Sequence, residues 1–164
     1  MRAAARLAAP EGGIIRAAWL RRYVELPDPP VAFMRVHSWD TAYKAAQHND
    51  PSVLTDWTAA TAANGKPPGF YLRNVFRERM TYPDLKRRVI EFAERDNPDA
   101  ILIEDKASGQ SLLQELRNDT SLPVIAIEPD GDKVTRALRI TPLMESRRVF
   151  VPERASWLLD YELE

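Results

Sequence analysis

Residues 98–119 read PDAILIEDKASGQSLLQELRND, and this stretch decides the fold. The apolar run 101–103 indicates a buried strand, because both of its sides are apolar. The strand ends at Glu104 and Asp105, and leucines at helical spacing follow, which predicts a helix with Ser108 as its N-cap. A buried strand followed directly by a helix is a building block of an α/β sheet.

The chain beyond this stretch continues the same alternation. Residues 122–132 predict a second buried strand and a turn that caps the next helix. That helix covers 132–148, and Pro142 is expected to bend or break it. A short extended piece at 149–152 and a last helix within 155–164 complete the pattern.

The chain before this stretch predicts strands that follow one another directly. Residues 31–40, 52–61 and 69–76 are rich in β-branched and aromatic residues, and short polar loops join them. Such strands favour an antiparallel meander. A helix over 82–98 then begins the alternation, so the fold class expected is α/β, with one mixed sheet and helices on both of its faces.

The N-terminal residues 1–30 are expected to be a linker. Residues 14–26 could form a short helix, and the prolines of 27–30 stop it. The domain proper is therefore predicted to cover 31–164.

Composition excludes several classes of protein. A chain of 164 residues, 45% hydrophobic and 29% charged, fits one globular domain. It has no cysteine, so disulfide frameworks and thiolate metal sites are excluded. No stretch approaches the ~20 apolar residues that span a bilayer, and the N-terminus lacks the apolar core of a secretory signal. GxxxxGK[ST], GxGxxG, HExxH and GxSxG are absent, which argues against an ATPase, dehydrogenase, zinc protease or serine hydrolase.

Charge is segregated along the chain although the net charge is −1. Residues 96–132 carry nine acidic and two basic side chains. The flanks are basic, with eight bases against four acids over 66–95 and six against two over 133–154. A metal site framed by a surface that binds a polyanion gives this pattern, and so do ordinary solvated helix faces.

Two of the predicted strands end in acidic side chains. Asp40 ends the first strand, and Glu104 and Asp105 end the fourth. If these strands are parallel neighbours, their carboxylates converge at one edge of the sheet, where ligands of α/β proteins bind. Converging carboxylates repel one another and need a shared proton or a cation such as Mg²⁺. Two bridged ions form the clamp that cleaves phosphodiesters.

Each of these acids also has a simpler interpretation. Asp40 could merely end a strand. Glu104 and Asp105 could instead stabilise the following helix through its dipole, because acidic side chains are favourable near a helix N-terminus. Lys106 could then be their ion-pair partner.

Five further polar residues are open to more than one interpretation. His37 is more often a packed strand residue than a ligand, and His48 is expected to be solvated. Asp56 alternates with a tryptophan and could face either side of its strand. Lys133 and Arg136 follow the predicted turn and contact either phosphate or solvent.

The sequence resembles the C-terminal nuclease domain of phage and prophage terminase large subunits. The similarity is collinear from about residue 10 to the end of the chain. It is carried by SWDTAYK (38–44), GFYLRNVFRERMTYPDLKRRV (69–89), PDAILIEDKASGQSLLQEL (98–116), LPVIAIEPDGDKVTRA (122–137) and PLMESRRVFVPE (142–153).

This resemblance implies a ribonuclease H-like fold and a metal-dependent endonuclease that cuts concatemeric double-stranded viral DNA. The family's first catalytic aspartate matches Asp40, and its second acid matches Glu104, with Asp105 beside it as a further candidate. The implied cofactors are two Mg²⁺ or Mn²⁺ ions. Lys106, Lys133 and Arg136 are candidate DNA contacts. The implied partners are the terminase ATPase domain, the small terminase subunit and the portal, in the cytoplasm of a bacterial host and without a membrane.

Two departures from the family pattern limit this implication. The ATPase half is absent, and the family's third acid lies beyond Glu164, so its role is not assigned to Asp160, Glu162 or Glu164. The domain is therefore expected to be incomplete at its C-terminus and weak or inactive as a nuclease. Two alternatives stay open: another ribonuclease H-like nuclease such as a junction resolvase, and a non-catalytic prophage remnant that binds DNA or packaging proteins.

Overall fold

The computed structural model describes residues 14–26, 33–42, 50–61 and 69–163. The strands are β1 (Arg21–Tyr23), β2 (Phe33–Asp40), β3 (Ser52–Ala60), β4 (Gly69–Glu78), β5 (Ala100–Glu104), β6 (Val124–Ile127) and β7 (Val149–Pro152). The helices are a 3-10 turn (Ala17–Trp19), α1 (Tyr82–Asp96), α2 (Ala107–Asp119), α3 (Lys133–Glu145) and α4 (Leu158–Leu163).

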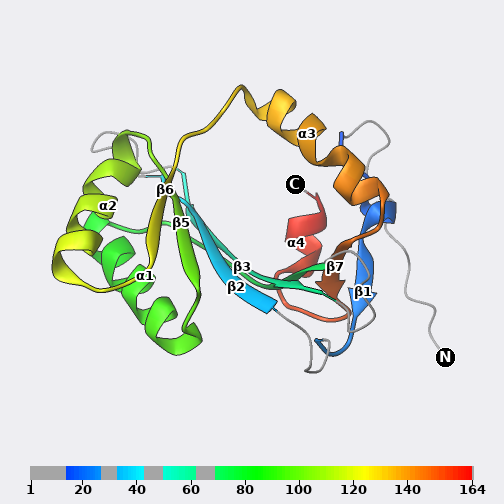
Figure 1. Cartoon of the computed structure of the whole chain (residues 1–164), viewed down its shortest axis with the longest axis horizontal. Coiled ribbons are helices and arrows are strands. Elements are labelled where there is room, and N and C mark those ends of the chain that lie inside the picture. The colour runs from blue at the N-terminus through cyan, green and yellow to red at the C-terminus, as the bar shows by residue number, and fades with distance from the viewer. Residues whose placement is uncertain (1–13, 27–32, 43–49, 62–68, 164) are drawn as a thin grey trace.

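The described strands form one mixed sheet in the order β1-β7-β4-β3-β2-β5-β6 (Figure 1). The strands β2, β3 and β4 are antiparallel neighbours, which confirms the predicted meander. The strand β5 lies parallel beside β2, and β6 lies parallel beside β5. On the other flank β7 runs parallel to β4. Parallel strands therefore extend the meander on both sides, β5 next to β2 and β7 next to β4.

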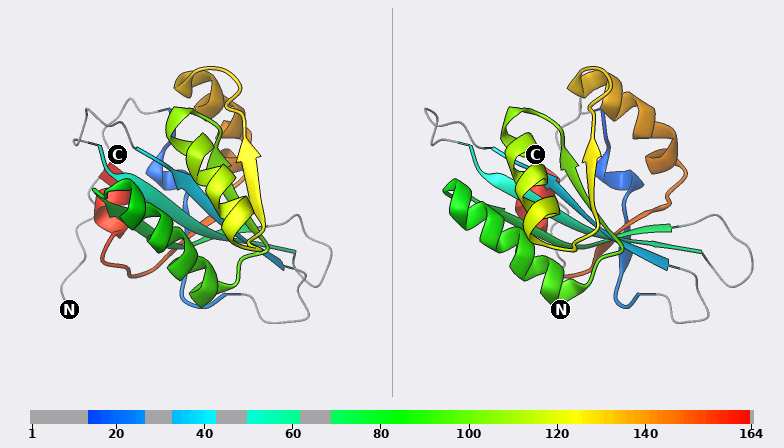
Figure 2. Two further views of the ribbon diagram at one scale, coloured as in Figure 1. Left: turned by 90° about the vertical axis from the view of Figure 1, so that its left-hand side faces the viewer. Right: turned by 60° about the vertical axis from the view of Figure 1, so that its left-hand side comes forward.

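Helices cover both faces of the sheet, as predicted. The helices α1 and α2 lie side by side against one face (Figure 2). On the other face α4 contributes Leu158 to a smaller core with Leu72 and Val151. The main core joins residues of β2, β3 and β5 to α1 and α2: Trp39, Leu54, Ile101, Ile103, Leu85, Val89, Phe92, Leu112 and Leu116.

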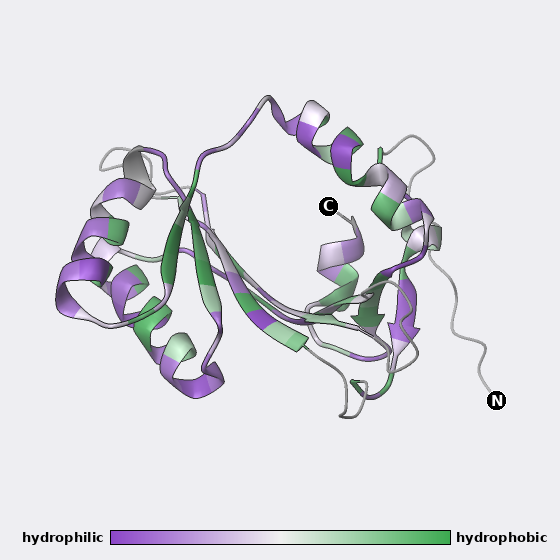
Figure 3. Ribbon diagram, viewed as in Figure 1, coloured by the Kyte–Doolittle hydropathy of each residue, from purple (hydrophilic) through white to green (hydrophobic). Residues whose placement is uncertain are grey.

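The strands β5 and β6 are hydrophobic over most of their length (Figure 3). Ile101 and Ile103 are fully buried on the side of α1 and α2. The apolar run 101–103 is thus the buried strand that its sequence predicts. Its burial fixes the direction of its other side chains, because successive residues of a strand point to opposite faces.

Helix α1 begins and ends where its sequence indicates. Pro83 lies in the first turn, where its missing N–H costs nothing. Asn97 adopts a left-handed conformation with φ of 46°, and its N–H donates to the Ala93 carbonyl at 2.8 Å. Asparagine tolerates this conformation better than most residues, so it ends the helix.

The predicted N-cap of α2 was wrong, and the break that Pro142 could cause in α3 is absent. Helix α2 begins at Ala107 with Lys106 as N-cap, so Ser108 lies inside the first turn. The reason is that the Lys106 carbonyl already accepts hydrogen bonds from Gly109 and Gln110, at 2.7 and 3.0 Å. Helix α3 is capped by the predicted turn, because Asp132 accepts from the Thr135 N–H at 2.7 Å. It continues through Pro142 to Glu145, so the proline does not break it.

The segment 14–26 does not form the short helix that was expected. It forms a 3-10 turn and then β1, which pairs in parallel with β7 at the edge of the sheet. The Glu153 N–H donates to the Tyr23 carbonyl at 2.8 Å, and the Arg21 guanidinium lies over the Phe150 ring. Part of the predicted linker therefore belongs to the sheet, and the domain boundary near residue 31 stays a prediction.

The helices in the described part of the chain are too short or too polar to span a bilayer.

Candidate metal centre

Asp40 and Glu104 end two neighbouring strands at the same edge of the sheet. They are the last residues of β2 and β5, which run parallel. The pairing of these strands ends with Trp39 opposite Ile103, so the next residue on each strand is an acid. Parallel neighbours run about 4.8 Å apart, so the backbones of Asp40 and Glu104 lie at adjacent strand ends.

The two acids also face the same side of the sheet. Trp39 and Ile103 both belong to the core against α1 and α2. Because side chains alternate along a strand, the residue after each of them points to the opposite face. Asp40 is exposed there and the Glu104 side chain is 22% exposed, so solvent reaches both carboxylates.

Two cations already contact the Glu104 carboxylate. The Lys106 ammonium lies 2.6 Å from Oε1, and the Arg136 guanidinium lies 3.0 Å from the same oxygen. Partial burial by itself raises the pKa of Glu104, but the hydrogen bonds and charges of Lys106 and Arg136 outweigh it and hold the pKa below its ordinary value. Glu104 is therefore ionised at neutral pH, as a metal ligand has to be.

The other predicted site residues come from the end of β5 and from helix α3. Asp105 follows the last residue of β5, is half-buried, and donates its N–H to the Ile127 carbonyl at 2.8 Å. Arg136 lies in α3, where sequence reasoning left open a contact with phosphate or solvent. The structure instead pairs it with Glu104. Lys133 is exposed at the first position of α3.

Gly109 allows helix α2 to begin close to the end of β5. A Cβ atom at this position would lie 2.0 Å from the Glu104 carbonyl oxygen, which is much closer than any real contact. Only glycine therefore lets α2 pack against the backbone that carries Glu104. Sequence reasoning did not assign Gly109, although the glycine after DKAS was a signal of such a close approach.

Replacing Gly109 with alanine is expected to lower the free energy of unfolding by about 1–3 kcal/mol, because the added methyl forces α2 away from β5. Chemical denaturation measures the loss. The matched control is Ser111→Ala on the exposed side of the same helix, which should change stability by less than about 0.5 kcal/mol. A Gly109→Ala variant as stable as wild type would show that the contact relaxes freely.

A second cluster of charged side chains is buried on the opposite face of the sheet. His37 and Asp56 are 0% and 1% exposed. The sequence did not decide which side of its strand Asp56 faces, and the structure shows that it faces the buried side. The Arg35 guanidinium holds both oxygens of Asp56, at 3.0 and 2.6 Å, and reaches Asp96 of α1 at 2.9 Å. Arg95 pairs with Asp96 as well, at 2.7 Å.

This buried cluster is an ion-pair network rather than a metal site. His37, Asp56 and Asp96 each place one ligand atom within 4.8 Å of the others. The Arg35 guanidinium, however, already contacts both carboxylates and supplies the positive charge that a cation would bring.

Two titratable side chains of this network have shifted pKa values. Burial lowers the pKa of His37 and outweighs the attraction of the two carboxylates, so the imidazole is neutral at pH 7. Burial raises the pKa of Asp96, but the Arg95 and Arg35 cations more than compensate, and the pKa lies below its ordinary value. His37 is thus the packed strand residue that was expected, and His48 lies outside the described residues.

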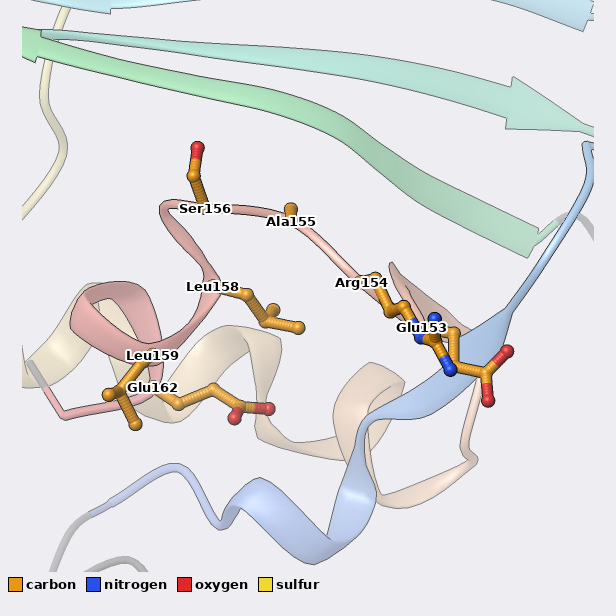
Figure 4. A pocket seen from close by; sticks show the side chains of 7 residues that line it. All are labelled: Glu153, Arg154, Ala155, Ser156, Leu158, Leu159 and Glu162. Atoms are coloured by element: carbon orange, nitrogen blue, oxygen red, sulfur yellow. The ribbon is translucent and has the colours of Figure 1, made fainter. Parts of the chain in front are cut away.

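The chain also has a hollow of about 490 Å³ between the connection after β7 and α4. Its lining side chains are shown in Figure 4: Glu153, Arg154, Ala155, Ser156, Leu158, Leu159 and Glu162. None of the predicted site residues lines it. Glu162 is paired with Arg22 of β1, so part of this lining joins α4 to the sheet edge.

The antiparallel meander extended on both sides by parallel strands defines a ribonuclease H-like domain. Residues 38–162 match the family described as "Terminase RNaseH-like domain". The chain therefore belongs to this family. The predicted resemblance and fold class are both confirmed.

Solved structures share this fold at low sequence identity. The P22 large terminase nuclease domain has a TM-score of 0.60 and 14% identity, over 93% of this chain and 78% of that chain. The large terminase nuclease from thermophilic phage G20c with bound magnesium has a TM-score of 0.57 and 13% identity, over 90% and 76%. A large terminase from another thermophilic bacteriophage has a TM-score of 0.58 and 11% identity, over 88% of this chain.

This chain covers only 34% of the last of these large terminases. The activities and partners of a whole terminase therefore cannot be assigned to this chain from the structural match alone. No curated protein gives a significant match to the chain.

Proposed function

We propose that this chain is a metal-dependent endonuclease domain that cuts double-stranded DNA during packaging of a phage genome. The observation that carries the proposal is the register of β2 and β5, which puts Asp40 and Glu104 side by side on one face of the sheet. Membership of the terminase RNaseH-like family supports the packaging role.

The residues at this edge fit a hard divalent cation such as Mg²⁺ or Mn²⁺. Such ions take oxygen ligands, and Asp40 and Glu104 offer carboxylates that solvent reaches. Asp105 is a further candidate ligand next to them. A divalent ion bound there would either activate the attacking water or stabilise the leaving oxygen of the phosphodiester.

The side chains around the acids have separate roles in this proposal. Asp40 and Glu104 hold the cation and orient it toward the scissile phosphate. Lys106 and Arg136 lie beside Glu104, and they and Lys133 at the start of α3 contact the DNA backbone, which makes binding sensitive to salt. In a complete terminase, the ATPase domain, the small subunit and the portal would bring DNA to this edge.

The activity of residues 1–164 is proposed to be weak. Two carboxylates on one face suffice for one hard ion, but two ions ~3.5–4 Å apart usually need a further acid to bridge or cap them. A single ion leaves either the attacking or the leaving oxygen less well stabilised. The chain should therefore bind DNA but cut it slowly.

The function is tested by incubating residues 1–164 with linear duplex and with a four-way junction in Mn²⁺. We expect slow cutting with a preference for the duplex, and loss of cutting in Glu104→Gln. Preference for the junction would instead favour a resolvase. Cutting that survives Glu104→Gln would place the catalytic site elsewhere, and Asp40-dependent Mn²⁺ binding without any cutting would favour the non-catalytic remnant.

A further inference from the structure

Two cationic side chains of the chain itself neutralise Glu104. The Lys106 ammonium and the Arg136 guanidinium both contact Oε1, at 2.6 and 3.0 Å. Both contacts are charge-assisted and therefore stronger than neutral hydrogen bonds. A cation that binds Glu104 has to compete with them.

Arg136 contacts Glu104 from a separate helix, α3. Lys106 lies two residues from Glu104 and its side chain is 54% exposed, whereas Arg136 comes from α3 and is 34% exposed. The first turn of α3 is fixed by its Asp132 cap, whose carbonyl also accepts the Arg136 N–H at 3.0 Å. The helix therefore presents the guanidinium to the acidic edge from a defined position.

The charges of the two acids and of the two cations at Glu104 balance one another. Asp40 and Glu104 contribute −2, and Lys106 and Arg136 contribute +2, so their sum is zero. A bound divalent ion raises the sum to +2 and repels the guanidinium. Two like charges repel one another, and the repulsion is stronger near a protein surface than in bulk water. A phosphate group of DNA at this edge would relieve that excess of positive charge.

We propose that Arg136 is an exchangeable counter-ion of the site. It pairs with Glu104 when no divalent ion is bound, leaves Glu104 when one binds, and then contacts a backbone phosphate of the DNA. This inference rests on the proposed function, because it takes Asp40 and Glu104 as the cation ligands. It makes binding of the cation and binding of DNA mutually cooperative, since each favours the same position of Arg136.

The first arm of the test is a calorimetric titration with Mn²⁺ in the absence of DNA. Arg136→Gln should bind Mn²⁺ about fivefold or more tightly than wild type, because a competing charge is gone. Arg136→Lys keeps the charge and should stay within about twofold of wild type. The matched control is Arg139→Gln, three residues along the same helix, whose partner is Asp130 at 2.6 Å. It should leave Mn²⁺ affinity unchanged.

The outcomes of this arm separate the inference from the function on which it rests. Unchanged or weaker Mn²⁺ binding in Arg136→Gln overturns the exchange, because Arg136 then does not compete with the cation. Mn²⁺ binding that survives Asp40→Asn overturns the proposed cation site itself. Thermal unfolding of each variant verifies that the protein is folded at the temperature of the titration.

The second arm measures the salt dependence of duplex DNA binding in Ca²⁺ and in a chelator. Ca²⁺ takes oxygen ligands as Mg²⁺ does. With Ca²⁺, Arg136→Gln should lower the salt slope by about one released counterion relative to wild type. In the chelator the two proteins should have equal slopes, because Arg136 is then held by Glu104. An equal loss of slope in both conditions would contradict the exchange and make Arg136 a permanent phosphate contact.

Discussion

Asp40→Asn is expected to lower the affinity of the chain for Mn²⁺ by more than about tenfold and to abolish metal-dependent cutting of DNA. The reason is that Asp40 and Glu104 are the two carboxylates that face the same side at neighbouring strand ends. An amide offers one neutral oxygen in place of a charged carboxylate, and hard cations strongly prefer charged oxygen ligands. Glu104 alone, paired with Lys106 and Arg136, would retain little attraction for a divalent ion.

Isothermal titration with Mn²⁺ measures this effect. The matched control is Glu94→Gln, which removes one negative charge from the exposed side of α1 on the opposite face of the sheet. It should leave Mn²⁺ affinity within about twofold of wild type, because exposed charges farther away than a Debye length of ~8 Å are screened. Equal losses of affinity in the two variants would mean that Mn²⁺ responds to net charge and not to a site at Asp40.

Arg35→Met is expected to destabilise the fold by about 3–5 kcal/mol, which is a large part of the stability of an ordinary domain. The methionine keeps much of the side-chain volume but removes the guanidinium that bridges Asp56 and Asp96. Asp56 is 1% exposed and would be left as a buried charge with its principal partner gone. The loss should appear as a lower midpoint in urea unfolding.

Two further variants distinguish this explanation from a simple packing defect. Arg35→Lys keeps the charge and loses the bidentate geometry, so it should cost less than Arg35→Met. Adding Asp56→Asn to Arg35→Met should recover part of the stability, because the unpaired charge is removed. If Arg35→Met costs less than about 1 kcal/mol, the buried network does not hold β2, β3 and α1 together.

The succession of strands and helices along the chain, apart from β1, could be predicted because its signals are local. The strands of the meander follow one another in the sequence without a helix pattern between them, and the apolar run 101–103 identifies β5 without reference to the rest of the chain. The parallel pairing of β5 with β2 was a hypothesis drawn from acids at both strand ends, and the register confirms that pairing. The placement of Asp40 and Glu104 at one edge follows from it.

The buried network could not be predicted from the sequence, because its members are far apart in the chain. Arg35, Asp56 and Asp96 lie on β2, β3 and α1, and no local pattern joins them. A signal was nevertheless present, since Arg35 and His37 alternate with Trp39 and therefore share its buried side. Polar residues on the buried side of a strand require partners.

The strand β1 and the pairing of Arg136 with Glu104 were missed for a related reason. Residues 21–23 have no strand pattern of their own, and they extend only because β7 offers a parallel neighbour. The pairing of Arg136 with Glu104 joins residues 32 positions apart across α2 and β6. Tertiary contacts of this kind override local propensity and cannot be read from a short window of sequence.

The cation site at Asp40 and Glu104 is tested most directly by X-ray diffraction from crystals of the chain soaked in Mn²⁺, recorded above the manganese absorption edge. We expect an anomalous peak between the carboxylates of Asp40 and Glu104, with the Arg136 guanidinium displaced from Glu104. A peak among His37, Asp56 and Asp96 would contradict the proposed site, because the ion would then have replaced Arg35 in the buried network. The absence of a peak at Asp40 in crystals saturated with Mn²⁺ would contradict it equally.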